Sequence, residues 1–157
     1  MFLGEYIHKM DSKNRIMMPS EFRLSLGEEF YLTKGPENSL VIYTEEEFQK
    51  RSQNLDQLIY ENKKNRAIKR LFFSSTVKMN LDKQGRILIN KNLKDYAKIS
   101  DEAIIIGNNN TIEIWDRKVW DEYINEVEVN LSDIMDEWYE IWTYTSSCKR
   151  NYRKFKY

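Results

Sequence analysis

The sequence predicts an α+β domain that is barrel-like and is built from two similar halves related by a pseudo-twofold axis. The first observation is a short motif, an Asp followed four residues later by an Arg and then by an apolar run, at residues 11–18 and again at residues 82–89. The second is that these copies lie 71 residues apart, while the hairpin segments behind them match at an offset of 72. Both observations predict short strands with small helices at their ends.

Each motif predicts a tight turn that leads into a strand. The fourth position is Asn14 in the first copy and Gly85 in the second, and these residue types most readily accept a left-handed backbone. The Asp can hydrogen-bond its own backbone, and the Arg leaves the turn outward. A turn that presents an arginine twice suggests a surface for an anionic partner.

A short helix and a hairpin are expected after each motif. Pro19 is expected at the first position of the first helix, with Phe22 and Leu26 on its apolar side. The first hairpin is predicted from strands at residues 30–32 and 40–43 around a turn at 35–38. Its counterpart is predicted from strands at residues 103–106 and 112–115 around a turn at 107–110.

Both hairpins are expected to end in the same kind of helix entry. Thr44 is a favourable N-cap, Glu47 completes a capping box, and Tyr43 is expected to pack against Phe48. Asp116 takes the capping position in the second half. The halves therefore match from the motif to the helix that follows the hairpin.

The segment between the halves, residues 45–72, is predicted to be helical. Residues 50–70 carry seven cations against two acids, a net charge of +5, and we favour a solvated helix face over a second DNA surface. Six apolar residues are available for burial: Leu55, Leu58, Ile59, Ile68, Leu71 and Phe72.

Near the C-terminus, an apolar stripe at helical spacing contains Ile134, Met135, Trp138, Ile141 and Trp142. Residues 113–141 carry ten acids against two cations, a net charge of −8. We favour a stripe that packs on its own protomer over one that docks on a neighbouring subunit. The last fifteen residues carry five cations, no acid and several aromatics, which fits a disordered tail, a nucleic-acid binding tail or a segment packed on the acidic helices.

The predicted organisation has five parts. They are a first module at residues 1–48, a basic helical connector at 49–73, a second module at 74–120, C-terminal helices at 121–142 and a basic aromatic tail at 143–157.

Composition argues against an enzyme, a metal site or a cofactor. One cysteine, Cys148, and one histidine, His8, make neither a disulfide nor a zinc site, and no glycine-rich phosphate loop is present. No apolar run reaches the length of a membrane span, and the N-terminus lacks the regions of a signal peptide. We therefore expect a cytoplasmic protein.

Several of these segments together resemble a known protein family. Its opening, residues 1–4, 10–16, 18–19 and 22–23, resembles the bacterial MraZ proteins, as do residues 82–89, Gly107 and residues 112–116. The resemblance covers about residues 1–142. It departs from the family pattern at Asn14, where the first motif commonly has glycine, and at Asn90, where the second module usually has proline.

The resemblance implies a fold and a function. Similar proteins contain two tandem AbrB-like swapped-hairpin modules, regulate transcription of the division and cell-wall gene cluster, and bind direct repeats in promoter DNA as ring-like oligomers. Such a protein would be nucleoid-associated. The motif residues carried over to this chain are Asp11, Arg15, Asp82 and Arg86.

DNA binding is therefore the leading hypothesis for the motifs. Arg15 and Arg86 can pair with guanine in a major groove, with Asp11 and Asp82 orienting them. Phosphate contacts are predicted for Lys13 and Lys83, and also for Lys9, Arg23 and Lys94.

Two other interpretations stay open. In the first, the Asp and Arg of each motif pair with each other and only hold the turn, a role that can coexist with DNA contact. In the second, the chain is a protein-interaction module, like antitoxins that bind a partner protein through an added C-terminal segment. Because two arginine turns on one protomer are few for a specific interface, DNA binding would require an oligomer of high order.

Overall fold

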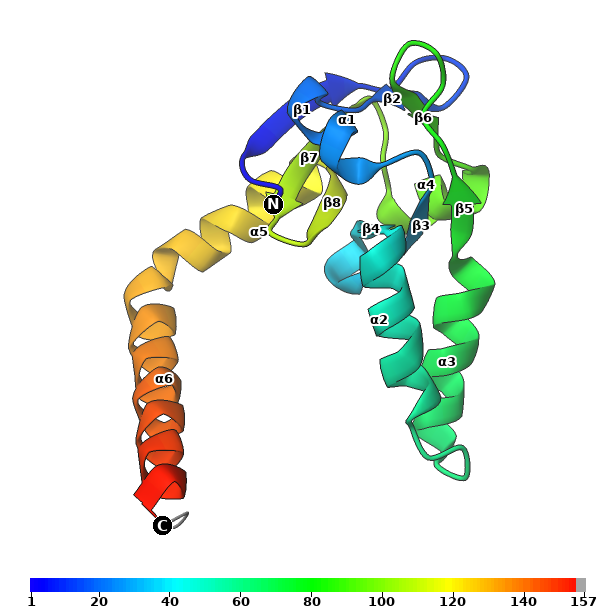
Figure 1. Ribbon diagram of the computed structural model, residues 1–157. Helices are drawn as coiled ribbons and strands as arrows, with labels where there is room; N and C mark the ends of the chain where they lie inside the picture. The colour runs from blue at the N-terminus through cyan, green and yellow to red at the C-terminus, as the bar shows by residue number, and fades with distance from the viewer. Residues whose placement is uncertain (155–157) are drawn as a thin grey trace. The chain divides into compact units, whose positions relative to one another are not determined.

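The computed structural model describes the backbone of residues 1–154 and the side chains of residues 1–142 (Figure 1). Each half holds four strands, a short helix before the third strand and a longer helix after the fourth. The first half contains β1 (Glu5–Lys9), β2 (Arg15–Met17), α1 (Ser20–Leu26), β3 (Phe30–Lys34), a 3-10 turn η1 (Pro36–Asn38), β4 (Leu40–Thr44) and α2 (Glu45–Asp56). After α3 (Lys63–Ser75), the second half contains β5 (Val77–Met79), β6 (Arg86–Leu88), α4 (Lys91–Ala97), β7 (Glu102–Asn108), β8 (Thr111–Asp116) and α5 (Arg117–Val129), and α6 (Leu131–Lys154) follows.

The main sheet is antiparallel and exchanges strands between the two halves. Its order is β1-β7-β8-β4-β3-β5, which reads the same from either edge when the halves are interchanged. The first strand of each half pairs with the hairpin of the other half, β1 with β7 and β5 with β3. Neither half can therefore complete its part of the sheet alone.

The remaining two strands, β2 and β6, form a separate antiparallel ribbon. Ile16 lies opposite Ile87, and Val41 of β4 lies opposite Glu113 of β8. Both pairs join equivalent positions of the two halves, so the pseudo-twofold axis passes between them and the predicted internal symmetry is confirmed. The strands are divided between two sheets, and their hydrogen bonds do not close them into one continuous barrel.

The two halves share one hydrophobic core. It is built from the ribbon, helices α1 and α4 and the inner faces of the hairpin strands. Ile16 and Ile87 are 0 % and 1 % exposed, so the inner face of the ribbon is anchored in the core. The ring of Phe22 on α1 makes edge-on contacts with Phe2 and Tyr6, with ring centroids 5.3 and 5.1 Å away.

The first short helix begins one residue later than the sequence pattern predicts. Pro19 is the N-cap of α1, with φ −51° and ψ 135°, so its predicted place at the first helical position was wrong. Its backbone angles are those of an N-cap, and proline satisfies that φ without strain. Asn90 is the equivalent N-cap of α4, and its side chain accepts a hydrogen bond from the Leu93 amide at 2.9 Å. The capping bond explains why asparagine suits the position where the family usually has proline.

The longer helices begin as predicted. The hydroxyl of Thr44 accepts a hydrogen bond from the Glu47 amide at 3.3 Å, and the Asp116 carboxylate accepts from the Lys118 and Val119 amides. Phe48, however, stacks on Tyr31 with ring centroids 3.8 Å apart. The aromatic contact at this helix entry is thus made with strand β3 and differs from the predicted packing on Tyr43.

The connector is helical as predicted, but most of its apolar residues are not buried. Leu55 is 8 % exposed, and Phe72 stacks against Phe48. Ile59, Ile68 and Leu71 were available for burial, but they are 68 %, 50 % and 56 % exposed in this chain alone. The helices α2 and α3 form a hairpin of which only one side packs on the sheet.

A second compact unit begins at Trp120 and includes most of α5 and all of α6. The predicted apolar stripe lies on α6, with side chains 41–65 % exposed. The α6 backbone is helical to Lys154. The predicted tail, residues 143–157, lies outside the residues whose side chains are described.

Candidate nucleic-acid interface

The first Asp–Arg motif is a hydrogen-bonded turn. One carboxylate oxygen of Asp11, Oδ1, accepts bonds from the Lys13 and Arg15 amides, both at 2.9 Å. The other, Oδ2, accepts from Arg15 Nε at 2.8 Å. Asn14 takes the left-handed conformation with φ 59°, as predicted for this position. The carboxylate therefore holds both the turn and the side chain of the arginine that leaves it.

The second motif repeats this geometry. Asp82 Oδ1 accepts from the Gln84 and Arg86 amides at 2.9 and 2.8 Å, and Oδ2 accepts from Arg86 Nε at 2.8 Å. Gly85 has φ 80°. The predicted pairing of Asp with Arg is confirmed in both motifs, so a structural role is present whatever else the arginines do.

The same contacts favour the charged form of both aspartates. The backbone N–H of Arg15 lowers the pKa of Asp11 most, and the Arg15 side chain and the Lys13 amide lower it further against an opposing desolvation. For Asp82, the backbone N–H of Arg86 lowers the pKa most, with the Arg86 side chain and the Gln84 amide adding to it. Both carboxylates are therefore charged at neutral pH.

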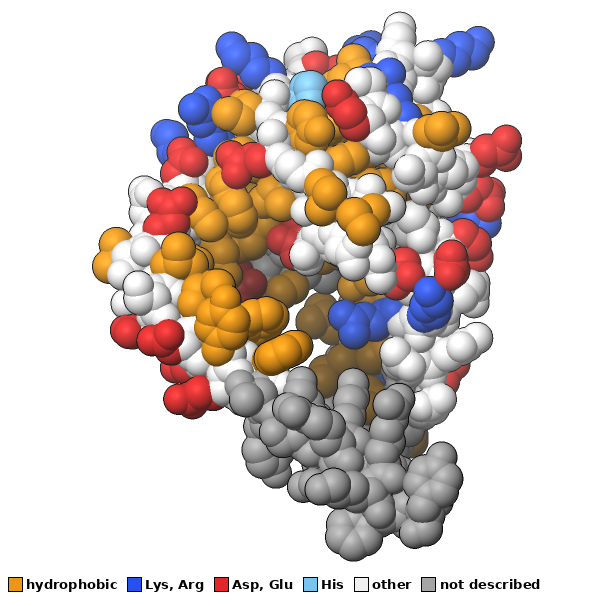
Figure 2. Space-filling view, turned by 60° about the vertical axis from the view of Figure 1, so that its left-hand side comes forward, with side chains coloured by type: hydrophobic (Ala, Val, Ile, Leu, Met, Phe, Trp, Pro, Cys, Tyr) orange, Lys and Arg blue, Asp and Glu red, His pale blue; other side chains and the backbone are white. Residues whose placement is uncertain are grey.

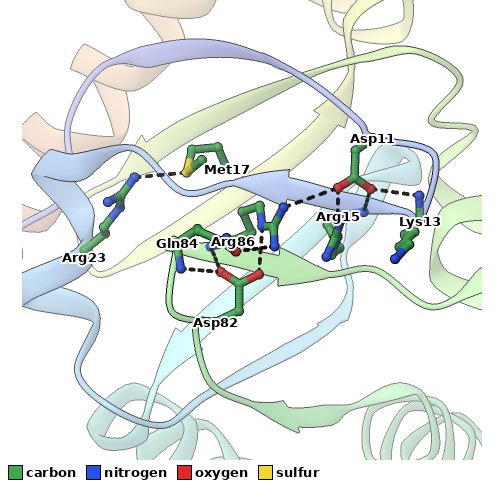
Figure 3. A network of polar contacts seen from close by, with 8 residues as sticks. All are labelled: Asp11, Lys13, Arg15, Met17, Arg23, Asp82, Gln84 and Arg86. Carbon is green, nitrogen blue, oxygen red and sulfur yellow. Dashed lines mark hydrogen bonds and ion pairs between the residues drawn. The ribbon is translucent and has the colours of Figure 1, made fainter.

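The ribbon brings the two motifs onto one surface (Figure 3). Its buried residues Ile16 and Ile87 point into the core, so the flanking Arg15 and Arg86 lie on the opposite, outer face. Nη1 of Arg86 lies 3.8 Å from Asp11 Oδ2, an ion pair that crosses from one motif to the other. Motifs 71 residues apart in the sequence therefore form one cluster.

The two arginines differ in what holds their terminal nitrogens. Nη2 of Arg86 donates to the side-chain oxygen of Gln84. Among the described residues, the terminal nitrogens of Arg15 have no hydrogen-bond partner, and its side chain is 30 % exposed. The guanidinium end of Arg15 is thus available to a ligand.

Helices α1 and α4 support the turns crosswise. Arg23 of α1 lies against the second turn, because a Cβ added to Gly85 would come within 2.5 Å of Arg23 Cζ. Its Nε donates to the Met18 carbonyl at 2.9 Å. Lys94, the equivalent residue of α4, donates to Asn14 Oδ1 of the first turn at 2.8 Å. These contacts give Arg23 and Lys94 a positioning role, while their phosphate contacts remain a prediction.

Three lysines predicted to contact phosphate are exposed. Lys13 and Lys83 lie in the two turns, and Lys9 lies at the end of β1. In the aligned motifs, Lys83 matches Ser12 and Lys13 matches Gln84, so the two turns carry their lysines at different positions. Figure 2 shows Lys and Arg side chains at the upper end of the molecule, the end at which Figure 1 draws the ribbon.

Other candidate chemistry is not supported in the described part of the chain. Burial, and to a smaller extent the charge of Arg23, lower the pKa of His8 on β1. No group of three His, Cys, Asp or Glu side chains among the described residues is placed to hold a metal ion. Cys148 lies outside the residues with described side chains. None of the described helices is long and apolar enough to cross a membrane.

Comparison with known proteins identifies the family. A family model described as "MraZ protein, putative antitoxin-like" matches the chain twice, over residues 1–71 and 72–139. The chain belongs to the MraZ family. A relative from Finegoldia magna named "Transcriptional regulator MraZ" is 44 % identical over 136 residues, which is 87 % of this chain and 95 % of that protein. A relative of the same name from Clostridium tetani is 46 % identical over 141 residues, 90 % of this chain and 99 % of that protein.

The two MraZ matches each contain one Asp–Arg turn, which agrees with the two structural halves. The names of the relatives support a role in transcriptional regulation.

Two features of the MraZ ribbon were missed from the sequence, namely the bond between Gln84 and Arg86 and the crosswise support from the helices. The alignment of Arg23 with Lys94 at the offset of 71 was a usable signal for that support, but it does not show which turn each residue contacts.

Proposed function

We propose that this protein is a sequence-specific DNA-binding transcriptional regulator that uses the outer face of the β2–β6 ribbon. The observation that carries this proposal is the convergence of both Asp–Arg pairs on that one face. The major groove of B-DNA admits a two-stranded ribbon, and the paired nitrogens of an arginine match O6 and N7 of guanine. Arg15 and Arg86 are the residues that contact bases.

The aspartates make this contact more effective by ordering the arginines in advance. Each carboxylate engages Nε of its arginine and so restricts the long side chain before DNA arrives. The terminal nitrogens of Arg15 are left for the groove, and Arg86 keeps further N–H donors because Gln84 takes only one of those on its terminal nitrogens. Lys9, Lys13 and Lys83 contact phosphates, which contribute affinity but little specificity.

The resemblance to the family supports a finer proposal. The exchange of β1 and β5 between the halves supports an AbrB-like swapped-hairpin fold. The protein then binds direct repeats in the promoter of the division and cell-wall gene cluster as a ring-like homo-oligomer, in the cytoplasm at the nucleoid. An oligomer follows from the small area of one ribbon, because several weak contacts on one assembly bind repeats together.

The test is to replace each ribbon arginine by alanine and to measure binding to the promoter upstream of the protein's own gene. Loss of a bidentate base contact costs about 1–3 kcal/mol, or roughly 5- to 150-fold in affinity. Arg70→Ala is the matched control, because it removes the same charge from the exposed side of α3, away from the ribbon. Unchanged affinity in both Arg15→Ala and Arg86→Ala would refute the proposal.

A second candidate function is a protein-interaction module that binds a partner through the C-terminal segment. The exposed stripe on α6, with Trp138 at 53 % exposure, and the antitoxin-like description of the family favour it. A co-purifying protein whose binding is lost in Trp138→Ala and is insensitive to salt would support this function. DNA binding that depends on Arg15 and Arg86 would not need such a partner.

A further inference from the structure

The β2–β6 ribbon is nearly symmetric in its backbone. Arg15 lies opposite Leu88 and Met17 lies opposite Arg86, so exchanging the strands reproduces the same arrangement. The bonds that join the turns to the strands repeat as well, since the Met18 amide donates to the Gly85 carbonyl and the Ile89 amide to the Asn14 carbonyl, both at 2.9 Å. A fully symmetric ribbon would read the same bases at both ends, because the symmetry of a site mirrors that of its protein.

The side chains break this symmetry beside the arginines. Residue 13 in the first turn is a lysine, and its equivalent in the second turn is Gln84. The amide oxygen of Gln84 accepts a hydrogen bond from Arg86 Nη2. Lys13 has only donors, so it cannot hold Arg15 in the same way. The backbone amides of both residues nonetheless make the same bond to the aspartate of their turn.

The two guanidinium groups are consequently held to different degrees. Asp82 binds Nε of Arg86 and Gln84 binds Nη2, so hydrogen bonds at two points fix the orientation of that guanidinium plane. The Asp11 carboxylate adds an ion pair, 3.8 Å from Nη1. Arg15 is fixed by Asp11 at Nε alone. A planar fork held at two points tolerates less misalignment with a base edge than one held at a single point.

Resting on the proposed function, we propose that Gln84 is a specificity-positioning residue that gives the ribbon a direction along DNA. At the Arg86 end, Gln84 locks the arginine and makes the readout of guanine strict. At the Arg15 end, the arginine can adjust, and Lys13 adds a cation for phosphate. One protomer therefore recognises an asymmetric site, which suits repeats that all run in the same orientation.

The experiment measures affinity for a set of duplexes in which each base pair of the protein's binding site is changed in turn. Gln84→Met removes the amide while keeping the length of the side chain, and Lys83→Met is the control at the adjacent exposed position. We expect Gln84→Met to lower discrimination by about fivefold or more at one guanine, the position at which Arg86→Ala abolishes it, while the opposite end is unchanged. Lys83→Met is expected to weaken binding to all duplexes alike and to reduce the salt dependence.

The exchange variant Lys13→Gln with Gln84→Lys gives a second test. If Gln84 had only a structural role, the pattern of base penalties would not change in this variant. It should transfer the strict end of the site from Arg86 to Arg15, so the pattern of base penalties reverses. Thermal unfolding of each variant reports whether the ribbon remains folded.

The inference is overturned if Gln84→Met weakens binding to all duplexes equally. It is also overturned if base changes at the two ends of the site reduce the affinity of the wild-type protein equally. In both cases Arg15→Ala and Arg86→Ala can still remove base discrimination. If neither arginine affects any duplex, the proposed function itself is wrong.

Discussion

The crosswise support of the turns makes a quantitative prediction for Gly85→Ala. At φ 80°, an L-residue in the left-handed region costs about 1–2 kcal/mol, while the loss of glycine freedom in the unfolded chain returns about 0.4–1 kcal/mol. The added Cβ would lie 2.5 Å from Arg23 Cζ, so the guanidinium must move and lose its bond to the Met18 carbonyl. A bond of this kind contributes about 1.5 kcal/mol.

Together these contributions predict that Gly85→Ala lowers the free energy of unfolding by about 2 kcal/mol. For a chain of this size, that corresponds to a fall in Tm of about 4–8 °C. The assay is thermal unfolding at one fixed protein concentration, because self-association would make Tm depend on concentration. A variant with the stability of the wild type would refute the steric argument.

A paired variant tests the role of Arg23 itself. Gly85→Asn with Arg23→Lys copies the Asn14–Lys94 arrangement of the other turn, in which asparagine tolerates positive φ and accepts the lysine. Each single variant should lower the free energy of unfolding. The double variant should lose about 1 kcal/mol less than the sum of the two single losses, which is within the range measured for residues in contact. Additive losses would show that residues 23 and 85 are not coupled.

Three further predictions concern the ribbon. Ile87→Ala should lower the free energy of unfolding by about 2–5 kcal/mol, because the side chain is 1 % exposed. Denaturant unfolding measures this loss, and a value below about 1 kcal/mol would contradict the prediction. The depressed pKa values of Asp11 and Asp82 stabilise the turns above the ordinary value of 3.8, and this stabilisation is lost as pH falls through the lower folded-state pKa. The amide NMR signals of the turns should therefore titrate with a midpoint below pH 3.8, and a midpoint above that value would be inconsistent with the carboxylate contacts. Lys83→Ala should reduce the slope of log affinity against log salt by about one, which a titration of DNA binding with salt would detect.

Much of the fold could be predicted because its signals are local. The left-handed turn positions, the apolar strands and the caps at Thr44 and Asp116 each follow from a few neighbouring residues. The internal repeat also predicted that the two halves are equivalent. Errors occurred where tertiary packing decides the outcome. Phe48 stacks on Tyr31 of β3, which lies seventeen residues earlier in the chain and directly opposite Tyr43 in the pairing of β3 with β4.

The candidate site was predicted as two turns, and their convergence was only inferred. Repeat spacing shows that Asp11 and Asp82 are equivalent, but it does not show that β2 pairs with β6 or that Arg86 reaches Asp11. The support of each turn by the helix of the other half depends on the same exchange between halves. Pairings between distant segments have no signature in a single sequence.

If the ribbon binds DNA as proposed, the exchange of strands also explains how a weak motif can support recognition. An exposed Asp–Arg pair on an isolated turn would contribute little, because its side chains would sample many conformations. Here Ile16 and Ile87 fix the ribbon to a core that both halves share, and Asn14–Lys94 and Gly85–Arg23 fix the two turns. The arginines therefore stand on a rigid element, and less freedom is lost when a base is bound. The backbone bonds of the ribbon repeat at its two ends, so a difference in readout comes from the side chains around the arginines. Lys13 and Gln84 differ in their hydrogen-bonding chemistry, and Asp11 lies within ion-pair distance of both arginines.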